Sequence, residues 1–139
     1  MPLTIRACKP DECAQVLELW KSAEAIPRPT DTLPELQRIV REHPDTLLVG
    51  EEAGRLVGTV IAGWDGWRGS LYRLAVVPEQ RQAGVGRLLV SEAERVLRDR
   101  GCPRVTALVH LELADAGPFW TNVGYHHDVE VGRFVRNLD

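Results

Sequence analysis

Apolar and polar positions along the chain predict a fixed order of strands and helices. Leu3–Cys8 alternates as a strand does. Val16 and Leu19 then recur at helical spacing, which predicts a helix opening near Pro10. The segment Ile26–Asp31 contains two prolines and breaks this helix, so it forms an elbow.

The next stretch predicts a second helix and two hairpins. Leu36 and Ile39 lie on the buried side of that helix, and Asp31 or Thr32 caps its start. Three β-rich runs follow, joined by short turns at Ala53-Gly54 and Asp65-Gly66, so neighbouring runs pair antiparallel. These runs are Thr46–Glu51, Arg55–Trp64 and Ser70–Val77.

The rest of the chain predicts a parallel crossover and closing strands. A helix over Gly84–Arg100 ends at Gly101, and Arg104–His110 then forms a strand parallel to Ser70–Val77. A short helix and two strands close the chain, at Ala114–Val123, Tyr125–Val131 and Arg133–Leu138. The predicted fold class is mixed α/β, with a central sheet of about six to seven strands flanked by about four helices.

Composition indicates one globular domain over residues 1–139, with 44% hydrophobic and 27% charged residues. A net charge of −3 gives no electrostatic case for nucleic acid. The longest uncharged apolar stretch, Leu56–Trp64, is too short to span a membrane, so we expect a cytoplasmic protein. The three cysteines lack metal or redox spacing, and we expect no metal.

The strongest chemical signal is the loop Arg81–Gly86, which lies between the apolar strand Leu71–Val77 and an amphipathic helix. Glycines at 84 and 86 let backbone amides close on a phosphate at the start of the helix. A dinucleotide fingerprint would need glycine at Leu89, and a P-loop would need Lys at Arg87. The remaining pattern, Arg-x-x-Gly-x-Gly after Val76-Val77-Pro78, resembles the coenzyme A signature of GNAT N-acetyltransferases.

Other features extend this resemblance over essentially the whole chain. The block Phe119–Tyr125 resembles the family's aromatic-aromatic-x-x-x-Gly-aromatic pattern, and the hairpin Val57–Ser70 resembles that of small bacterial members. The resemblance implies a GNAT-like fold and acetyl-CoA as cosubstrate. It also implies that the backbone of Leu74 and Val76 meets pantetheine, and that the glycine loop meets the pyrophosphate. The implied loop contacts are Gln82, Ala83, Gly84, Val85 and Gly86, while Arg81 and Arg87 either add charge near the phosphates or are solvated.

Two positions depart from the family pattern. Trp120 stands where the family often has a tyrosine that protonates the departing thiolate, and an indole N–H is no acid near neutral pH. Leu113 stands where an asparagine is often found. Tyr72 is a candidate replacement acid, with wall packing as the alternative. Strict alternation predicts that Ser70, Tyr72, Leu74 and Val76 share one sheet face and that Arg73 lies on the other.

Amine acetylation also needs a base and contacts to the acceptor. His110 has the best-suited pKa for a base, and Glu112, Asp65 and Glu24 are further candidates. Glu24 and Asp31 lie on the family's substrate side, so they and Asp65 are candidate acceptor contacts, with capping or solvation as the alternative. His126 and His127 are expected at the surface.

The sequence therefore predicts an acetyl-CoA-dependent N-acetyltransferase that acts by direct transfer on a primary amine of a small metabolite. A protein N-terminus or lysine is the alternative acceptor, and a non-catalytic coenzyme A-binding module or a pure interaction protein is the alternative function. We expect no nucleic-acid or membrane partner, and a monomer or homodimer.

Overall fold

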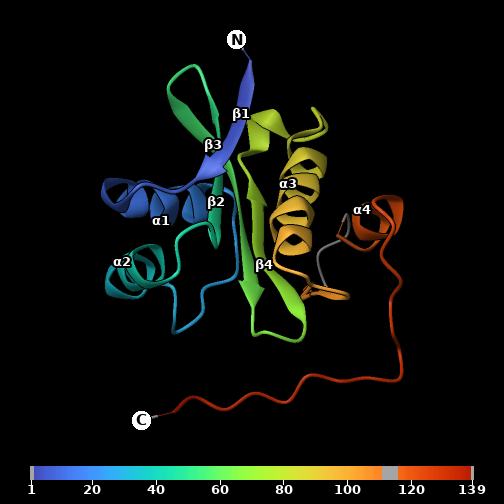
Figure 1. Ribbon diagram of the computed structural model, residues 1–139. Coiled ribbons are helices and arrows are strands. Elements are labelled where there is room, and N and C mark those ends of the chain that lie inside the picture. Colours follow the sequence, from blue (N-terminus) through green and yellow to red (C-terminus); the bar gives the residue numbers. More distant parts are fainter. Residues whose placement is uncertain (1, 111–115, 139) are drawn as a thin grey trace. The chain divides into compact units, whose positions relative to one another are not determined.

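The structure, a computed structural model, describes residues 2–110 and 116–138, and the chain divides into two compact units, Met1–Leu108 and Val109–Asp139. Figure 1 shows the elements in chain order. They are β1 (Leu3–Ala7), a 3-10 helix (Pro10–Glu12), α1 (Cys13–Ser22), α2 (Leu33–Glu42), β2 (Leu47–Glu52), β3 (Arg55–Trp64), β4 (Gly69–Val76), a 3-10 helix (Pro78–Gln80), α3 (Val85–Asp99), β5 (Val105–Ala107) and α4 (Ala116–Asn122).

A mixed sheet forms the centre of the first unit. Its strand order is β1-β2-β3-β4-β5, with antiparallel pairing as far as β4 and parallel pairing between β4 and β5. The mixed α/β class and the parallel crossover are confirmed. The described residues form five strands rather than six to seven, and β5 is shorter than the predicted Arg104–His110.

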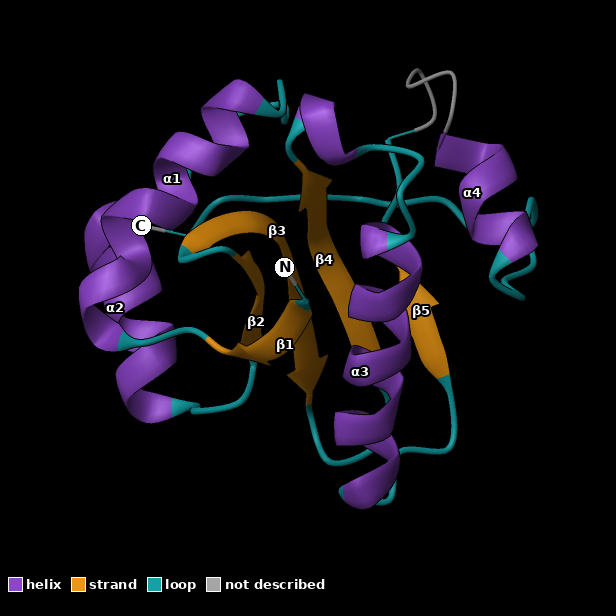
Figure 2. Cartoon of the chain, turned by 90° about the horizontal axis from the view of Figure 1, so that it is seen from above, coloured by secondary structure: helices purple, strands orange, loops and turns teal. Residues whose placement is uncertain are grey.

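Helices cover both faces of this sheet, with α1 and α2 on one side and α3 on the other (Figure 2). Two glycines let α3 lie close to the strands. A Cβ at Gly58 would stand 2.8 Å from Leu89 Cδ1, and one at Gly69 would stand 2.9 Å from Leu97 Cδ1. Because Leu89 and Leu97 are fully buried, larger residues at these glycines would force α3 away from the core.

The ends of the helices agree with the sequence signals. Thr32 rather than Asp31 caps α2, since its Oγ1 accepts a hydrogen bond from the amide of Glu35 at 3.4 Å. Gly101 follows α3 with a φ of 89°, a left-handed conformation that glycine adopts without strain. None of the described helices is long and apolar enough to cross a membrane.

A β-bulge in β4 overturns the predicted alternation. Tyr72 pairs with Ile61 and Ala75 with Thr59, so Arg73 and Leu74 together oppose one residue of β3. Tyr72 and Val76 therefore lie on opposite faces, and the side chains of Tyr72 and Arg73 both turn toward the face that carries α1 and α2. Period-2 counting failed here because an inserted residue shifts every later side chain to the other face.

The second unit contains α4 and the C-terminal segment. Gly124 ends α4 with a φ of 99°, and the amide of Tyr125 bonds the carbonyl of Trp120 at 2.9 Å. Residues 125–138 form no strand, so the two predicted closing strands are wrong for this structure. Apolar alternation indicates that a segment can become a strand, but it does not supply the partner that a ladder requires.

Candidate functional site

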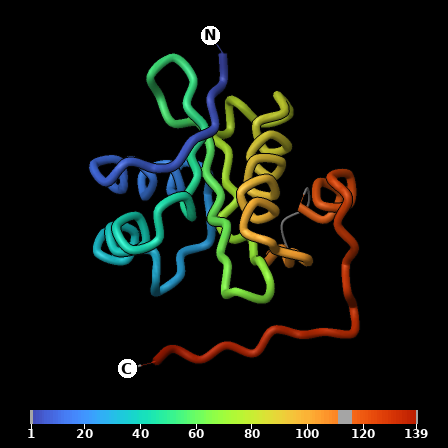
Figure 3. Tube along the Cα trace, in the orientation of Figure 1, coloured from blue at the N-terminus to red at the C-terminus, as the bar shows by residue number. Residues whose placement is uncertain are grey.

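The glycine loop (Arg81–Gly86) presents backbone amides at the start of α3. The Cα trace in Figure 3 follows the chain from β4 through this loop into the helix. Gly84 is the N-cap residue with a φ of 86°, and no side chain caps the helix there. Among the described residues, no protein acceptor meets the amides of Gly84, Val85, Gly86 and Arg87. Several unpaired amides on a positive helix end form an anion-binding arrangement.

Beside this loop, one half of β4 has an open edge. Pairing with β5 covers only Gly69–Leu71, and the last bond runs from the amide of Leu108 to the carbonyl of Leu71 at 3.1 Å. From Tyr72 to Val76, β4 bonds β3 on one side and none of the described strands on the other. We call Tyr72–Val76 the open half of β4. It includes Leu74 and Val76, the two residues predicted to meet pantetheine through their backbone.

The arginines predicted near the phosphates have different surroundings. Arg81 donates through Nε to the Val76 carbonyl at 3.2 Å and through Nη2 to the Ala23 carbonyl at 2.8 Å. Arg87 is exposed on the first turn of α3. In this structure Arg81 thus holds the loop to the end of α1, and a phosphate contact from either arginine stays a prediction.

Two of the three predicted acceptor contacts have structural partners. Asp31 forms an ion pair with Arg73 and accepts the amide of Arg28 at 2.8 Å. Asp65 accepts the amides of Arg68 and Trp67 at 2.8 Å each, and these bonds lower the pKa of its exposed carboxyl group.

Glu24, the third predicted acceptor contact, is exposed and takes a left-handed φ of 60° just after α1. A non-glycine residue in this conformation is uncommon. The role of all three carboxylates in acceptor binding stays a prediction.

Tyr72, the candidate acid, lies in the open half of β4 with 39% of its surface exposed. Its ring occupies the space over Gly63, where a Cβ would stand 3.2 Å from ring atom Cε2. A side chain at position 63 would therefore displace the ring. The structure places Tyr72, the glycine loop and the elbow (Ile26–Asp31) in the same unit.

The other candidates for catalysis belong to the second unit. Nδ1 of His110 is buried and has no hydrogen-bond partner among the residues that the structure describes. Trp120 is also buried and makes edge-to-face contacts with Phe119 and Tyr125, with ring centroids 5.3 Å and 5.0 Å away. His126 and His127 are exposed, as expected. Leu113 and Glu112 lie outside the described residues.

Sequence reasoning missed a group of contacts centred on Arg73. Its guanidinium meets Asp31 and the carbonyl of Ile26, and it lies 5.2 Å from the ring centroid of Trp20. Trp20 in turn donates to Thr59, which is fully buried. The available signal was an arginine inside an apolar strand, because a charged side chain in such a place requires a partner.

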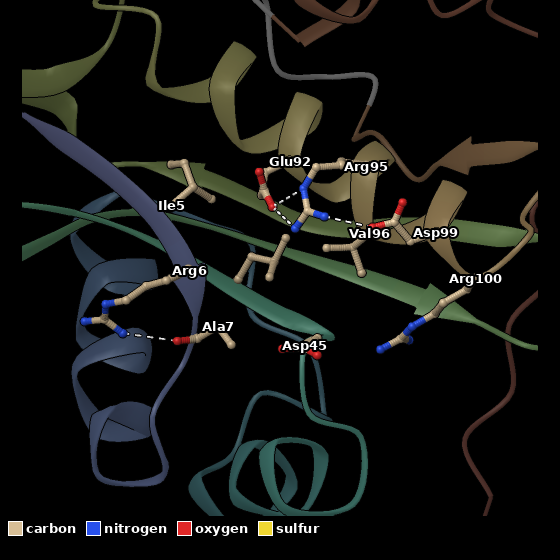
Figure 4. A pocket seen from close by; sticks show the side chains of 10 residues that line it. Ile5, Arg6, Ala7, Asp45, Glu92, Arg95, Val96, Asp99 and Arg100 are labelled. Atoms are coloured by element: carbon tan, nitrogen blue, oxygen red, sulfur yellow. Dashed lines mark hydrogen bonds and ion pairs between the residues drawn. The ribbon is translucent and has the colours of Figure 1, made fainter.

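A pocket of about 320 Å³ lies at the other end of α3 (Figure 4). Most of the charged groups in its lining already have partners within the protein. Arg95 donates to Glu92 at 2.7 Å and to Asp99 at 2.8 Å, and Arg100 donates to the carbonyl of Pro44 at 3.2 Å. This end of α3 carries the negative end of the helix dipole, which disfavours a phosphate.

Comparison with known proteins identifies relatives of the chain. The family model described as "Acetyltransferase (GNAT) family" matches residues 13–125. An acetyltransferase of Photorhabdus laumondii is 36% identical over 107 residues, which cover 77% of this chain and 75% of that protein.

Two solved structures share the fold. PaiA N-acetyltransferase from Thermoplasma acidophilum, in complex with coenzyme A, aligns with a TM-score of 0.79 at 17% identity, covering 92% of each chain. An aminoglycoside N-acetyltransferase bound to a coenzyme A bisubstrate analogue aligns with a TM-score of 0.78 at 17% identity, covering 99% of this chain and 100% of that one. At these identities the likeness establishes the fold alone.

Proposed function

The chain belongs to the GNAT family of acetyltransferases and is an acyltransferase, and on this premise we propose that it moves the acetyl group of acetyl-CoA directly to a primary amine of a small metabolite. The observation that carries the proposal is the continuity of two features. The open half of β4 leads, through the short 3-10 helix Pro78–Gln80, into the glycine loop, where the amides of Gly84, Val85 and Gly86 have no protein acceptor among the described residues.

The chain's own groups fit an extended, phosphate-bearing cosubstrate. The Val76 carbonyl accepts from Arg81 Nε, and the remaining backbone groups of Leu74 and Val76 are suited to the amides of pantetheine, which pairs with a strand edge as a further strand would. The amides from Gly84 to Arg87 suit the pyrophosphate, because each lies at the positive end of α3. Gly84 is needed for its left-handed backbone rather than for space, since a Cβ there would meet nothing within 4 Å.

The reaction needs a neutral amine and a way to release the thiolate. Acetyl-CoA supplies a thioester carbonyl, which the amine nitrogen attacks as the carbon–sulfur bond breaks. A lysine-like amine costs about 4–5 kcal/mol to deprotonate at pH 7, so a base lowers the barrier. His110 is our candidate for this base, supported by its buried Nδ1, which meets no partner within residues 2–110 and 116–138.

Tyr72 is our candidate for the group that protonates the leaving thiolate. Its exposure and its position in the open half of β4 support this role. The resemblance, in which Trp120 stands where the family often has its tyrosine, supports a role for Trp120 as a wall residue; within its own unit its ring contacts Phe119 and Tyr125. Its indole N–H can donate a hydrogen bond but cannot supply a proton near neutral pH.

A small-molecule acceptor is favoured by the fold neighbour bound to an aminoglycoside-based analogue. Incubation of the protein with acetyl-CoA and a panel of primary amines, amino acids and peptides, followed by mass spectrometry, tests the proposal. We expect acetylated products among the small amines. Products only among the peptides would redirect the acceptor class, and no product with any amine would contradict direct amine acetylation.

A further inference from the structure

Arg73 connects the strand that carries the open edge to the elbow (Ile26–Asp31). Its side chain is 16% exposed and its partner Asp31 is 17% exposed, so water screens this pair far less than a surface pair. Nε donates to Asp31 Oδ1 at 3.1 Å, and Nη2 donates to the Ile26 carbonyl at 2.8 Å and to Asp31 Oδ2. One guanidinium thus holds both ends of the elbow.

The backbone of Arg73 is fixed by a side chain of the neighbouring strand β3. Its φ of 52° is left-handed, and its carbonyl accepts a hydrogen bond from Thr59 Oγ1 at 3.0 Å. The same Thr59 oxygen accepts from Trp20 Nε1 at 2.9 Å, which joins α1 to β3. A strained backbone conformation persists only where its surroundings over-determine it, and these bonds do so.

A second arginine holds the neighbouring segment to the glycine loop. Arg81 bonds the carbonyl of Ala23, at the end of α1, and the carbonyl of Val76, at the end of β4. A cation at the C-terminal end of a helix is favoured by the helix dipole. The chain between α1 and α2 is therefore tied at its start to the glycine loop and through the elbow to the bulge of β4.

We propose that Arg73 is a positioning residue that couples the elbow to the open half of β4, so that the conformation of the elbow and the affinity for acetyl-CoA depend on each other. The inference rests on the proposed function, because it takes the open half of β4 as the cosubstrate site. Coupling of this kind is reciprocal, so bound acetyl-CoA must stabilise the elbow as much as the elbow strengthens binding. In this proposal Arg73 itself contacts neither the amine nitrogen nor the thioester carbonyl carbon.

Two variants test the coupling with little change in shape. Asp31→Asn removes the charge of the carboxylate, and Arg73→Lys keeps the charge but loses the planar fork that reaches Asp31 and Ile26 together. Glu35→Gln is the matched control, because it removes the exposed ion pair with Arg38 on α2. The measurements are acetyl-CoA affinity by calorimetry and hydrogen exchange of residues 23–31 with and without acetyl-CoA.

In the wild type and in Glu35→Gln, we expect acetyl-CoA to slow exchange across residues 23–31. In Asp31→Asn and Arg73→Lys, we expect this protection to be lost and the Kd for acetyl-CoA to rise about fivefold or more, the low end of coupling between sites. A lower Tm with unchanged Kd and unchanged protection would overturn the proposal, since that is what a purely structural ion pair would give.

Failure of the proposed function gives a different result. If the wild type binds no acetyl-CoA, the cosubstrate site itself is wrong and the coupling is overturned with it. If the wild type binds acetyl-CoA but shows no protection at residues 23–31, only the coupling is overturned.

Discussion

The two ends of α3 differ in how their polar groups are satisfied. At the N-terminal end, several backbone amides have no acceptor and the nearby half of β4 has no neighbouring strand on one side, among the described residues. At the C-terminal end, Arg95 pairs with Glu92 and Asp99, and all three side chains line a pocket of about 320 Å³. The distance along the helix from Gly84 to Arg95 is about 16 Å, so the two sites are separate.

This difference indicates which end of the helix is suited to a ligand. A pocket lined by paired charges contributes little free energy to ligand binding, because a ligand must first break the ion pairs that already exist there. Unpaired amides on a positive helix end gain bonds when an anion arrives. The polar groups that lack hydrogen-bond partners therefore indicate the candidate site better than the volume of a pocket does.

The largest effect on acetyl-CoA affinity should come from a carboxylate introduced at the N-terminal end of α3. Gly86→Glu places a negative charge and a side chain beside the amides that we propose to hold the pyrophosphate, so acetyl-CoA binding should be abolished in calorimetry. Ser91→Glu, an exposed position further along α3, should leave the Kd within about twofold, because a helix-end effect falls off within the first turn. Unchanged affinity in a folded Gly86→Glu variant would contradict our assignment of the loop.

Much of the fold could be predicted because its determinants are local. Helical spacing and glycine or proline signals gave α1, α2 and α3 to within a few residues. The bulge at Arg73 could not be predicted, because it depends on how β4 pairs with β3. The missing strands in residues 125–138 have a similar cause, since pairing is a property of two segments and alternation is a property of one.

The same distinction applies to the candidate site. The glycine loop was visible in the sequence because it needs small residues at fixed spacing. The contacts of Arg73 with Asp31, Ile26 and Trp20 join residues 42 to 53 positions apart, and no short-range pattern reports them. Asp31 was therefore predicted as an acceptor contact, whereas the structure gives its carboxylate a partner within the protein.

The next largest effect concerns Tyr72 in the open half of β4. If its hydroxyl protonates the thiolate, Tyr72→Phe should lower kcat by about 10²–10⁴-fold with the Kd for acetyl-CoA unchanged. Steady-state kinetics with the amine that the wild type acetylates best would measure this. Activity within a few-fold of wild type would leave Tyr72 as a packing residue over Gly63.

A smaller effect is expected at Trp120. Phenylalanine can keep the edge-to-face contacts with Phe119 and Tyr125 while losing the indole N–H. We therefore expect kcat of Trp120→Phe within about tenfold of wild type, because the lost donor is not an acid. A greater loss at unchanged acetyl-CoA affinity would show that the N–H orients a reacting group, and Trp120→Tyr would then test whether a hydroxyl replaces it.

The smallest effect is expected at the paired end of α3, where Arg95→Gln removes the ion pairs with Glu92 and Asp99. These partners lie at the surface, where ion pairs add little to stability and are screened by salt, so the Tm should change little. Because the pocket lies at the negative end of the helix dipole, we expect the Kd for acetyl-CoA to stay within about twofold of wild type. Calorimetry at low and at physiological salt would check this.

The two salt concentrations distinguish two causes of a weaker affinity, because salt screens only long-range charge effects. A weaker affinity at low salt alone would reflect the lost positive charge acting at long range. A weaker affinity at both salt concentrations would mean that the pocket takes part in cosubstrate binding, and the contrast between the two ends of the helix would be wrong.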